Sequence, residues 1–595
     1  MSPWRLSALQ LAVLAGAFLT ITTELLSAFQ LLNPTAVALS WLAFAVCTVR
    51  RFPARPKALS ATDCFLLAPV LFLVALLGWL ALISPPNTYD AMAYHLPRVV
   101  YWAQQHSVAS FPTPYLNQLQ FPPFAEYLSL HLWLLTGGDH LANLPQWLGY
   151  AGSILAASAL AADLGATARG QIITAILVAT TPNAILQATG AKNDCVLSFW
   201  LLCVILFSRR ALELRHPPWF AACAVALALL SKGTAYLFVL PILLAIVLPR
   251  ICQSALFIAA TLLLTVLLNG PFYLRNLELS GHPLGFDSAH GDGRYRVRND
   301  RLGWDVTVSN AIRSLSAHLA FRDPATNQLV YQSVLATHRF LGIDPADPAT
   351  TWPDGSFTPP ANSNHEANSP NRWQLLLLAL ALPIALWQSP TRWLALGWLA
   401  AWLLFFSLLR WQPYMSRLHL PLFLTGAVFV GLSLDQLRSR FLSIGIALLL
   451  LLNARPYVLN NWLRPLSGSE SILQTSRAQN YFRDIAPITD YPSAAQAVDR
   501  IAQSGCRRVG IDSNRMELEY PFLALLLERD PRFVFQHLDV RNPSLRYEPP
   551  NAPPPCAILC LHCAAESSAP PVRYPHFPPP LSIGRHLIFL PPLLP

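Results

Sequence analysis

The chain has 595 residues, of which 54% are hydrophobic and 12% are charged, and its formal net charge is +10. Its mean hydropathy of +0.40 lies outside the range of soluble proteins and predicts a multi-span membrane protein. The positive charge does not indicate nucleic-acid binding, because most arginines lie between apolar runs, where they retain loops in the cytoplasm.

Runs of about 20 apolar residues predict the membrane spans. The first run, 6–29, is too long for the hydrophobic region of a cleavable signal and is expected to be a retained span. The further runs cover residues 31–49, 64–84, 140–163, 170–188, 195–208, 218–231, 235–249, 254–274, 373–389, 393–409, 418–434 and 441–459. Several are short, and 218–249 could be one re-entrant pair. The predicted fold is mainly α, a polytopic membrane bundle of about 13 spans.

Basic residues between the runs predict the orientation of the chain. They follow every even-numbered run: Arg50, Arg51, Arg55, Lys57, Arg169, Arg209, Arg210, Arg215, Arg250, Arg392, Arg438 and Arg440. The positive-inside rule places these loops and the amino terminus in the cytoplasm. We therefore expect a transmembrane module over 1–460, with outer loops at 85–139 and 276–371, and an extracytoplasmic domain over 461–595.

The first outer loop carries an acid, Asp90, close to the end of the third run. A charge at a membrane boundary is costly unless it is paired or hydrated, which favours a role in chemistry or recognition. The structural alternative is that Asn87 or Thr88 caps a helix whose first turn holds Asp90, a position that the helix dipole favours. Helical spacing then predicts a short surface helix over 92–105 and a second helix over 126–135.

Basic residues also lie at the outer ends of spans, where the positive-inside rule disfavours them. They are Lys192, Lys232, Arg275, Arg410 and Arg417. Because Arg and Lys are the usual phosphate ligands, this set favours one site for a phosphate-bearing ligand. The alternative for each residue alone is that its side chain extends to the outer lipid headgroups.

The polar regions outside the membrane have different characters. Segment 276–371 lacks sustained periodicity, and we expect a partly ordered lid with short helices near 310–321 and 328–340. After Asn460 a small α/β domain is predicted. Its helices are expected at 493–503 and 517–528 and its strands at 508–512, 533–540, 557–561 and 586–590. No Gly-rich phosphate loop follows its first strand, so no nucleotide site is predicted.

Four cysteines lie in the predicted outer domain: Cys506, Cys556, Cys560 and Cys563. In an oxidising compartment they could form two disulfides, in any of three pairings. A zinc site is the weaker alternative.

The order of several motifs resembles that of the C-type membrane glycosyltransferases. The motifs are YDAMAYHLPRVVYW, FPPFAEYLSLHLWLLTGG, AKNDCVLSFW, SKGTAY, RNLELSGHPLG and RWQPYMSRLHLPLF, within roughly residues 60–435. The nearest branch is that of the protein O-mannosyltransferases and aminoarabinose transferases, glycosyltransferase family 39, in its bacterial members. The resemblance implies an enzyme of the bacterial inner membrane that takes a sugar from a polyprenyl phosphate at the outer face. The chain departs from the simplest plan of the family by two extra spans before the loop of Asp90, and by His95.

The resemblance maps the catalytic acid of the first outer loop onto Asp90 and a second acid onto Asp194. A sugar phosphodiester has a good leaving group, so the reaction needs chiefly a base for an acceptor hydroxyl and cations for the phosphate. Asp90 is the expected base, and direct displacement would invert the anomeric centre. The expected substrate-binding residues are His95, Arg98, Lys192, Lys232, Arg275 and Arg417.

Asp194 could orient the acceptor, hold a divalent metal or position a lysine; no cofactor is certain and metal dependence stays open. The acceptor could be a glycan, a lipid or a protein. The alternative functions are a non-catalytic polyprenyl-phosphate-binding protein and a lipid or saccharide transporter. A transporter would more often keep polar residues at mid-membrane, whereas this chain keeps them at outer ends.

Overall fold

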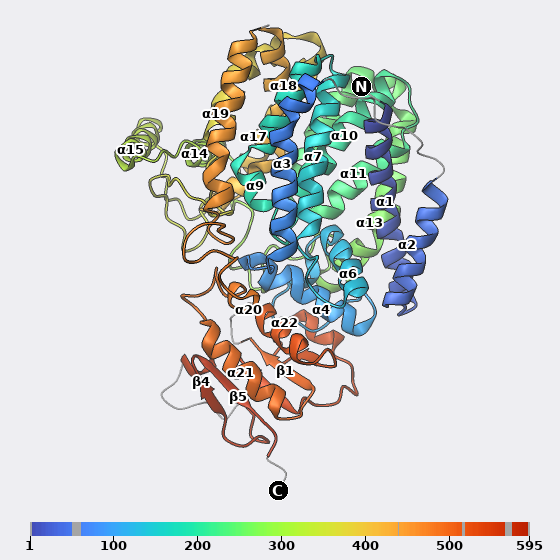
Figure 1. The fold of residues 1–595 in the computed structure, drawn as a ribbon, viewed down its shortest axis with the longest axis vertical. Helices are drawn as coiled ribbons and strands as arrows, with labels where there is room; N and C mark the ends of the chain where they lie inside the picture. The colour runs from blue at the N-terminus through green and yellow to red at the C-terminus, as the bar shows by residue number, and fades with distance from the viewer. Residues whose placement is uncertain (1–2, 50–60, 438, 514–517, 566–573, 593–595) are drawn as a thin grey trace.

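The structure is a computed structural model that describes residues 3–49, 61–437, 439–513, 518–565 and 574–592 (Figure 1). Long helices run side by side in one bundle, and the carboxyl-terminal domain lies at one end of it. Every predicted apolar run is helical. The helices are α1 Pro3–Ala28, α2 Pro34–Val49, α3 Ala61–Ile83, α7 Leu144–Asp163, α8 Ala168–Ala179, α9 Pro182–Gln187, α10 Asp194–Glu213, α11 Trp219–Ser231, α12 Ala235–Val247, α13 Ala255–Ser280, α16 Arg372–Trp387, α17 Ser389–Leu408, α18 Leu420–Gln436 and α19 Arg440–Leu459.

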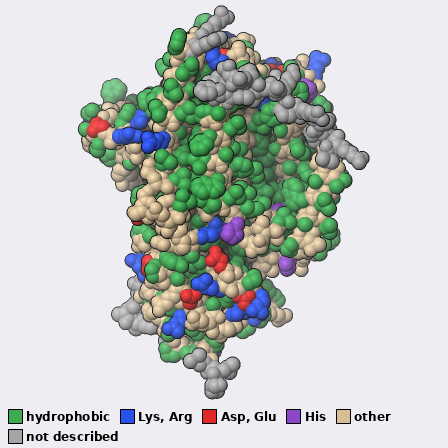
Figure 2. Space-filling model, viewed as in Figure 1, with side chains coloured by type: hydrophobic (Ala, Val, Ile, Leu, Met, Phe, Trp, Pro, Cys, Tyr) green, Lys and Arg blue, Asp and Glu red, His purple; other side chains and the backbone are tan. Residues whose placement is uncertain are grey.

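Length and composition make many of these helices suitable for a membrane. Within the described residues, 7 helical segments are long and apolar enough to cross one, and several shorter apolar helices accompany them. Figure 2 shows hydrophobic side chains over the surface of the bundle and charged side chains gathered near and over the carboxyl-terminal domain. The predicted class of mainly α membrane bundle is confirmed, whereas the number of crossings stays a prediction.

Helix α10 is central to the bundle and packs against α7, α11 and α18. Small residues allow the closest approach: a Cβ on Gly149 of α7 would lie 2.6 Å from the backbone of Cys195 in α10. Without a solvent-driven hydrophobic effect between helices in lipid, such backbone proximity is a main source of helix association. The close packing of α7 on α10 fixes the position of Asp194, the first residue of α10.

The basic links predicted to be cytoplasmic share one end of the bundle. Arg210, near the end of α10, pairs with Asp163 at the end of α7 at 2.7 Å, and Arg169 at the start of α8 faces Asp435 near the end of α18 at 3.4 Å. Asp194 begins α10 and Arg417 precedes α18, at the opposite ends of these two helices, and Asp90 is paired with Arg417 there. These basic links thus share one end of the bundle, whereas the side of the membrane that each end faces stays a prediction. The predicted basic residues Arg50, Arg51, Arg55, Lys57 and Arg438 lie outside the described residues.

The opposite end carries the predicted surface helices. A π-helical turn, η1 Ala91–His95, leads into α4 Leu96–Gln105, followed by α5 Asn117–Gln120 and α6 Phe124–Thr136. Pro97 lies in the first turn of α4, where its missing N–H costs least. The long outer segment contains α14 Trp304–Ala317 and α15 Pro324–Leu341, which project from the side of the bundle in Figure 1. The helices predicted in these two loops are confirmed.

The carboxyl-terminal domain is α/β, as predicted. Its helices are α20 Arg477–Asn480, α21 Tyr491–Gln503 and α22 Tyr520–Arg529, and its strands are β1 Arg508–Asp512, β2 Val534–His537, β3 Ala557–Cys560, β4 Leu581–Ile583 and β5 His586–Phe589. The sheet order is β2-β1-β3-β5-β4; β1 runs parallel to β2 and β3, and β5 runs antiparallel to β3 and β4. Short 3-10 turns, η2 Leu248–Gln253, η3 Met415–His419, η4 Pro543–Tyr547 and η5 Cys563–Ala565, complete the chain. Strand β4 is an addition to the predicted elements.

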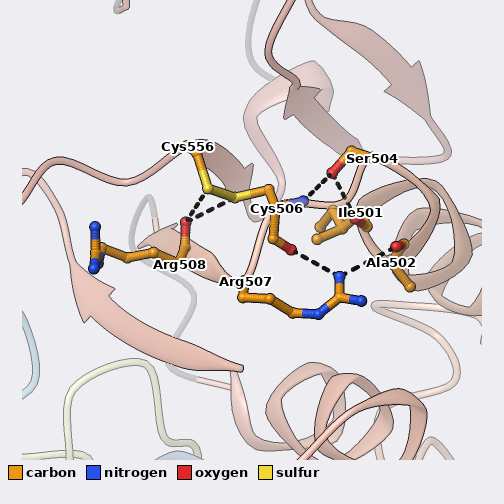
Figure 3. Close-up of a disulfide and its surroundings, with 7 residues drawn as sticks. All are labelled: Ile501, Ala502, Ser504, Cys506, Arg507, Arg508 and Cys556. Atoms are coloured by element: carbon orange, nitrogen blue, oxygen red, sulfur yellow. Dashed lines mark hydrogen bonds between the residues drawn. A yellow bond between two sulfur atoms is a disulfide. The ribbon is translucent and has the colours of Figure 1, made fainter. Parts of the chain in front are cut away.

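Two disulfides occur in this domain, Cys506–Cys556 and Cys560–Cys563. Figure 3 shows the first, which joins the residues just before β1 and β3, with both sulfurs close to the Arg508 carbonyl. It therefore links the starts of two adjacent parallel strands. Asp512 lies beside the second pair, with the three ligand atoms within 4.8 Å of one another. Sulfurs that are bonded to each other do not offer the thiolates that a zinc site needs.

The domain is packed onto the outer loops rather than tethered beside them. Asn87 donates to the carbonyls of Leu463 and Asn480, both at 3.0 Å. Asp139, which follows α6, accepts hydrogen bonds from Arg477 at 2.7 Å, Tyr481 at 2.5 Å and Tyr520 at 2.9 Å. These buried contacts place the domain next to the loop that carries Asp90.

Candidate functional site

Asp90 is paired with Arg417. Asp90 lies between α3 and η1, and Arg417 lies in η3, just before α18; Arg417 Nη1 donates to Asp90 Oδ2. The two side chains are 18% and 17% exposed, so both are partly accessible to solvent. Thr88 Oγ1 also accepts a hydrogen bond from Ala91 N at 3.3 Å, so the helix-capping interpretation and the ion pair hold together.

The charge state of Asp90 follows from its surroundings. Burial alone would raise the pKa of its carboxyl group. The positive charges of Arg417, Lys192 and His95, together with the Arg417 hydrogen bond, outweigh burial and lower the pKa below its usual value. Asp90 is therefore a carboxylate at neutral pH.

The second acid, Asp194, is close to the same cations. It is the first residue of α10, is 1% exposed and accepts a hydrogen bond from Lys232 Nζ at 2.5 Å. Lys192 and Arg417 also interact with it electrostatically. Among the described residues, no hydrogen-bond partner reaches its buried Oδ2 atom. We call Asp90, Lys192, Asp194, Lys232 and Arg417 the outer ion cluster.

A third acid, Glu366, completes the surroundings of this cluster. It comes from the long outer segment and pairs with Lys192 through Oε1, while Arg464 of the carboxyl-terminal region lies 3.4 Å from Oε2. All three side chains are at most 2% exposed. A Cβ on Gly190 would lie 3.2 Å from Glu366 Oε2, so a residue without a side chain leaves room for this carboxylate. Neither Glu366 nor Arg464 is distinguishable in the sequence from the other charged residues of polar loops.

His95 and Arg98 belong to a neighbouring buried group. His95 Nδ1 lies 2.7 Å and Arg98 Nη1 lies 3.2 Å from Glu126 Oε1. Arg98 also donates to the carbonyls of Leu119 and Phe121. Burial would raise the pKa of Glu126, but the charges of His95 and Arg98 and the His95 hydrogen bond lower it. The helix dipole alone could account for an acid in the first turn of α6. The contacts show that Glu126 also links α6 to His95 and to Arg98 of α4.

Arg275 lies beside this second group. It makes two bonds of 2.8 Å to the carboxylate of Glu24 and one of 2.8 Å to the hydroxyl of Tyr127. It shares with Arg98 a cavity of about 10 Å³, which holds no more than a water molecule.

Arg410 is separate from both groups. It lies 2.5 Å from Asp300 and donates to the carbonyl of Arg298 at 3.0 Å, beside an open hollow at Trp352 and Gly355. Of the five outer cations, the structure thus brings Lys192, Lys232 and Arg417 together around two acids and leaves Arg275 and Arg410 elsewhere.

The outer ion cluster combines a proton acceptor with cations at one end of the bundle. Ionised Asp90 can accept a proton, and Arg417 Nε is buried with no hydrogen-bond partner among the described residues. Both acids are paired with a cation through one oxygen, and Asp194 Oδ2 is left without a hydrogen-bond partner among the described residues. The arrangement suits an anionic ligand more directly than a metal ion.

Comparison with known proteins supports the fold. No protein-family model matches the chain, and no curated protein matches it at a significant level. Two solved structures match, those of ArnT from Cupriavidus metallidurans bound to undecaprenyl phosphate and in the apo state. The TM-score is 0.51 for each, at 16% and 14% sequence identity, over 89% of this chain and 98% of ArnT. The chain therefore shares the fold of ArnT.

Proposed function

We propose that the protein transfers a sugar from a polyprenyl-phosphate donor to an acceptor hydroxyl, with inversion at the anomeric carbon. The observation that carries the proposal is the outer ion cluster, in which Asp90 and Asp194 lie next to three cations. The ArnT fold, found in a structure with undecaprenyl phosphate bound, supports the class of donor.

Asp90 is the proposed base. As the acceptor oxygen attacks the anomeric carbon, its proton passes to the Asp90 carboxylate, and the bond between that carbon and the phosphate oxygen breaks. The electron pair leaves with the polyprenyl phosphate, whose growing charge Arg417 and Lys192 stabilise. One displacement without a covalent intermediate inverts the configuration.

Arg417 has two tasks in this scheme. Its bond to Asp90 keeps the base ionised, and its unpartnered Nε can donate to a phosphate oxygen. The phosphate and Asp90 are thereby held on one guanidinium group, which places the base near the reacting carbon.

The other predicted site residues have supporting roles in the proposal. Asp194 fixes Lys232, and its free Oδ2 faces the acceptor or a metal ion. His95 and Arg98 hold the loop of Asp90 through Glu126. Arg275 fixes α13 against α1 and α6 through Glu24 and Tyr127 instead of binding the phosphate.

The site is placed on the outer face of a bacterial inner membrane, with the amino terminus in the cytoplasm. The support is the set of basic links at the end opposite Asp90. Reporter fusions after α2 and in the carboxyl-terminal domain should report cytoplasm and outside, respectively. The reverse pattern would overturn the placement.

The direct test of the activity uses purified full-length protein and a panel of undecaprenyl-phosphate sugars with labelled sugar groups. With acceptors from an envelope extract, a transferase releases undecaprenyl phosphate and labels the acceptor. A protein that only binds or moves the lipid would hold the donor and release nothing. Donor binding without release across the panel would therefore favour the non-catalytic alternative.

A further inference from the structure

The carboxyl-terminal domain contacts the chain on both sides of Asp90. On the amino-terminal side, Asp484 Oδ2 accepts a hydrogen bond of 3.0 Å from the backbone N–H of Tyr89, the residue before Asp90. The other oxygen of Asp484 lies 3.1 Å from His365 Nε2, next to Glu366. The helix dipole favours a carboxylate beside the first N–H groups of a helix. Here the carboxylate belongs to Asp484, which is 395 positions after Tyr89 in the chain.

On the carboxyl-terminal side, the contact runs through Gln118. Ala93 lies in η1, three residues after Asp90, and its carbonyl has no α-helical partner because Pro97, four residues on, lacks an N–H. Gln118 Nε2 donates to this carbonyl at 3.0 Å and also donates to Glu519 Oε1 at 2.8 Å.

Glu519 is itself held rigidly. It precedes α22, is 2% exposed and lies 2.9 Å from His537 Nε2 and 3.4 Å from the Tyr101 hydroxyl of α4. His537 Nδ1 faces the carbonyl of Pro112 at 2.9 Å, so both ring nitrogens of His537 face acceptors. The carboxylate is thus fixed from two sides, and it fixes Gln118 in turn.

We propose that Asp484 and Glu519 are positioning residues for Asp90, and that the carboxyl-terminal domain is an integral part of the transferase site. The proposal rests on the proposed function of Asp90 as base. The two carboxylates hold the backbone one residue before and three residues after Asp90, and neither contacts the ion cluster directly. They therefore act on where the base lies and leave the phosphate cations in place.

The test compares Asp484→Ala and Glu519→Ala in the full-length protein. A displacement of a reacting group by about 1 Å can cost about a hundredfold in rate, so we expect kcat to fall by about tenfold or more with donor affinity unchanged. Asp484→Asn should recover most of the rate, because its amide oxygen can still accept from Tyr89 N–H. The matched control is Asp499→Ala in the same domain, whose side chain is 45% exposed and pairs with Arg529; it should behave as wild type.

If Asp484 and Glu519 had only a structural role, their variants would lose stability without a selective change in kcat. A further variant, at Gln118, tests the same link independently. Gln118→Met breaks the same link from the membrane side. In a double-mutant cycle with Glu519→Ala, the two losses should be far from additive, because both act through the Ala93 carbonyl. If Glu519→Ala fails to fold, Gln118→Met alone still tests the link to the Ala93 carbonyl through kcat.

The outcomes separate this inference from the proposed function. Wild-type kcat in folded Asp484→Ala, Glu519→Ala and Gln118→Met, with Asp90→Asn inactive, would overturn the positioning role and leave the function standing. Transfer by Asp90→Asn at the wild-type rate would overturn the function itself. Additive losses in the Gln118 and Glu519 cycle would also contradict the proposed link.

Discussion

Arg417 donates a hydrogen bond to the carboxylate of Asp90, although the two residues are 327 positions apart in the chain. The pair joins the start of α18 to the first outer loop and brings the proposed base and a proposed phosphate-binding group to the same point. Pairing also offsets part of the cost of burying the charge of Asp90 beside the apolar helices.

Replacing Arg417 with Ala should weaken donor binding. A hydrogen bond to a charged group contributes about 1.5 to 3 kcal/mol, so the donor Kd should rise by roughly ten- to a hundredfold. Titration with undecaprenyl phosphate measures this. Arg410→Ala is the matched control, because Arg410 is also an outer arginine but pairs with Asp300 away from the cluster. Equal donor affinity in the two variants would favour the alternative that the Arg417 side chain only contacts lipid headgroups.

The lowered pKa of Asp90 predicts the pH dependence. A carboxyl group whose folded-state pKa is lowered contributes stability above its ordinary pKa of about 4 and loses it only as the pH falls through the lowered value. The wild-type rate should therefore show no acid limb from Asp90 between about pH 5 and 8. Arg417 lowers the pKa of Asp90 more than any other group does. In Arg417→Gln the pKa of Asp90 should therefore rise, and the fall of the rate at low pH should begin at a higher pH than in the wild type. Superimposable normalised profiles of the two proteins would refute this assignment.

Replacing Glu366 with Ala should destabilise the protein strongly. The change leaves Lys192 and Arg464 buried without their shared carboxylate, a situation that typically costs about 3 to 5 kcal/mol. Thermal unfolding in detergent measures the loss. Glu278→Ala removes an exposed acid of the same segment, near the end of α13, and it should change stability by less than about 0.5 kcal/mol. Similar small effects for both would mean that the buried network is not formed.

The two disulfides should differ in their contribution to stability. Cys506 and Cys556 are 50 positions apart, whereas Cys560 and Cys563 are 3 apart. Loop-closure entropy then predicts about 4 kcal/mol for the first and about 2 kcal/mol for the second. Proteolysis of the carboxyl-terminal domain should accelerate more in Cys506→Ser/Cys556→Ser than in Cys560→Ser/Cys563→Ser. Faster proteolysis of the Cys560→Ser/Cys563→Ser protein would show that the Cys506–Cys556 disulfide does not stabilise the domain by linking the two strands.

Elements with a strong local signal could be predicted from the sequence. The apolar runs correspond to helices because about 20 apolar residues encode a span without reference to partners. Strand β1 has the predicted bounds, and α21 begins at Tyr491, two residues before its predicted start and directly after the capping residue Asp490. Strand β4 could not be predicted, because its three residues are ordered only by pairing with β5.

The partners of the charged residues could not be predicted. Each outer cation finds an acid on a distant element, and only the packing of helices decides which. Arg275, for example, finds Glu24 on the first helix, 251 positions away. Glu366 gave no signal because the segment that carries it has no periodicity. The sequence alone predicted that several outer cations suit a phosphate site. It did not predict that Arg275 and Arg410 would lie apart from the outer ion cluster.

The central claim is tested most directly by turnover of Asp90→Asn. Asn retains the shape of the side chain and suits a helix start, but it cannot accept the proton. With purified full-length protein, a labelled undecaprenyl-phosphate sugar and its acceptor, turnover should fall by about a hundredfold or more while donor binding persists, because the phosphate cations are unchanged. Near-normal transfer by the correctly folded variant would remove Asp90 from the mechanism and leave Asp194 as the remaining candidate base.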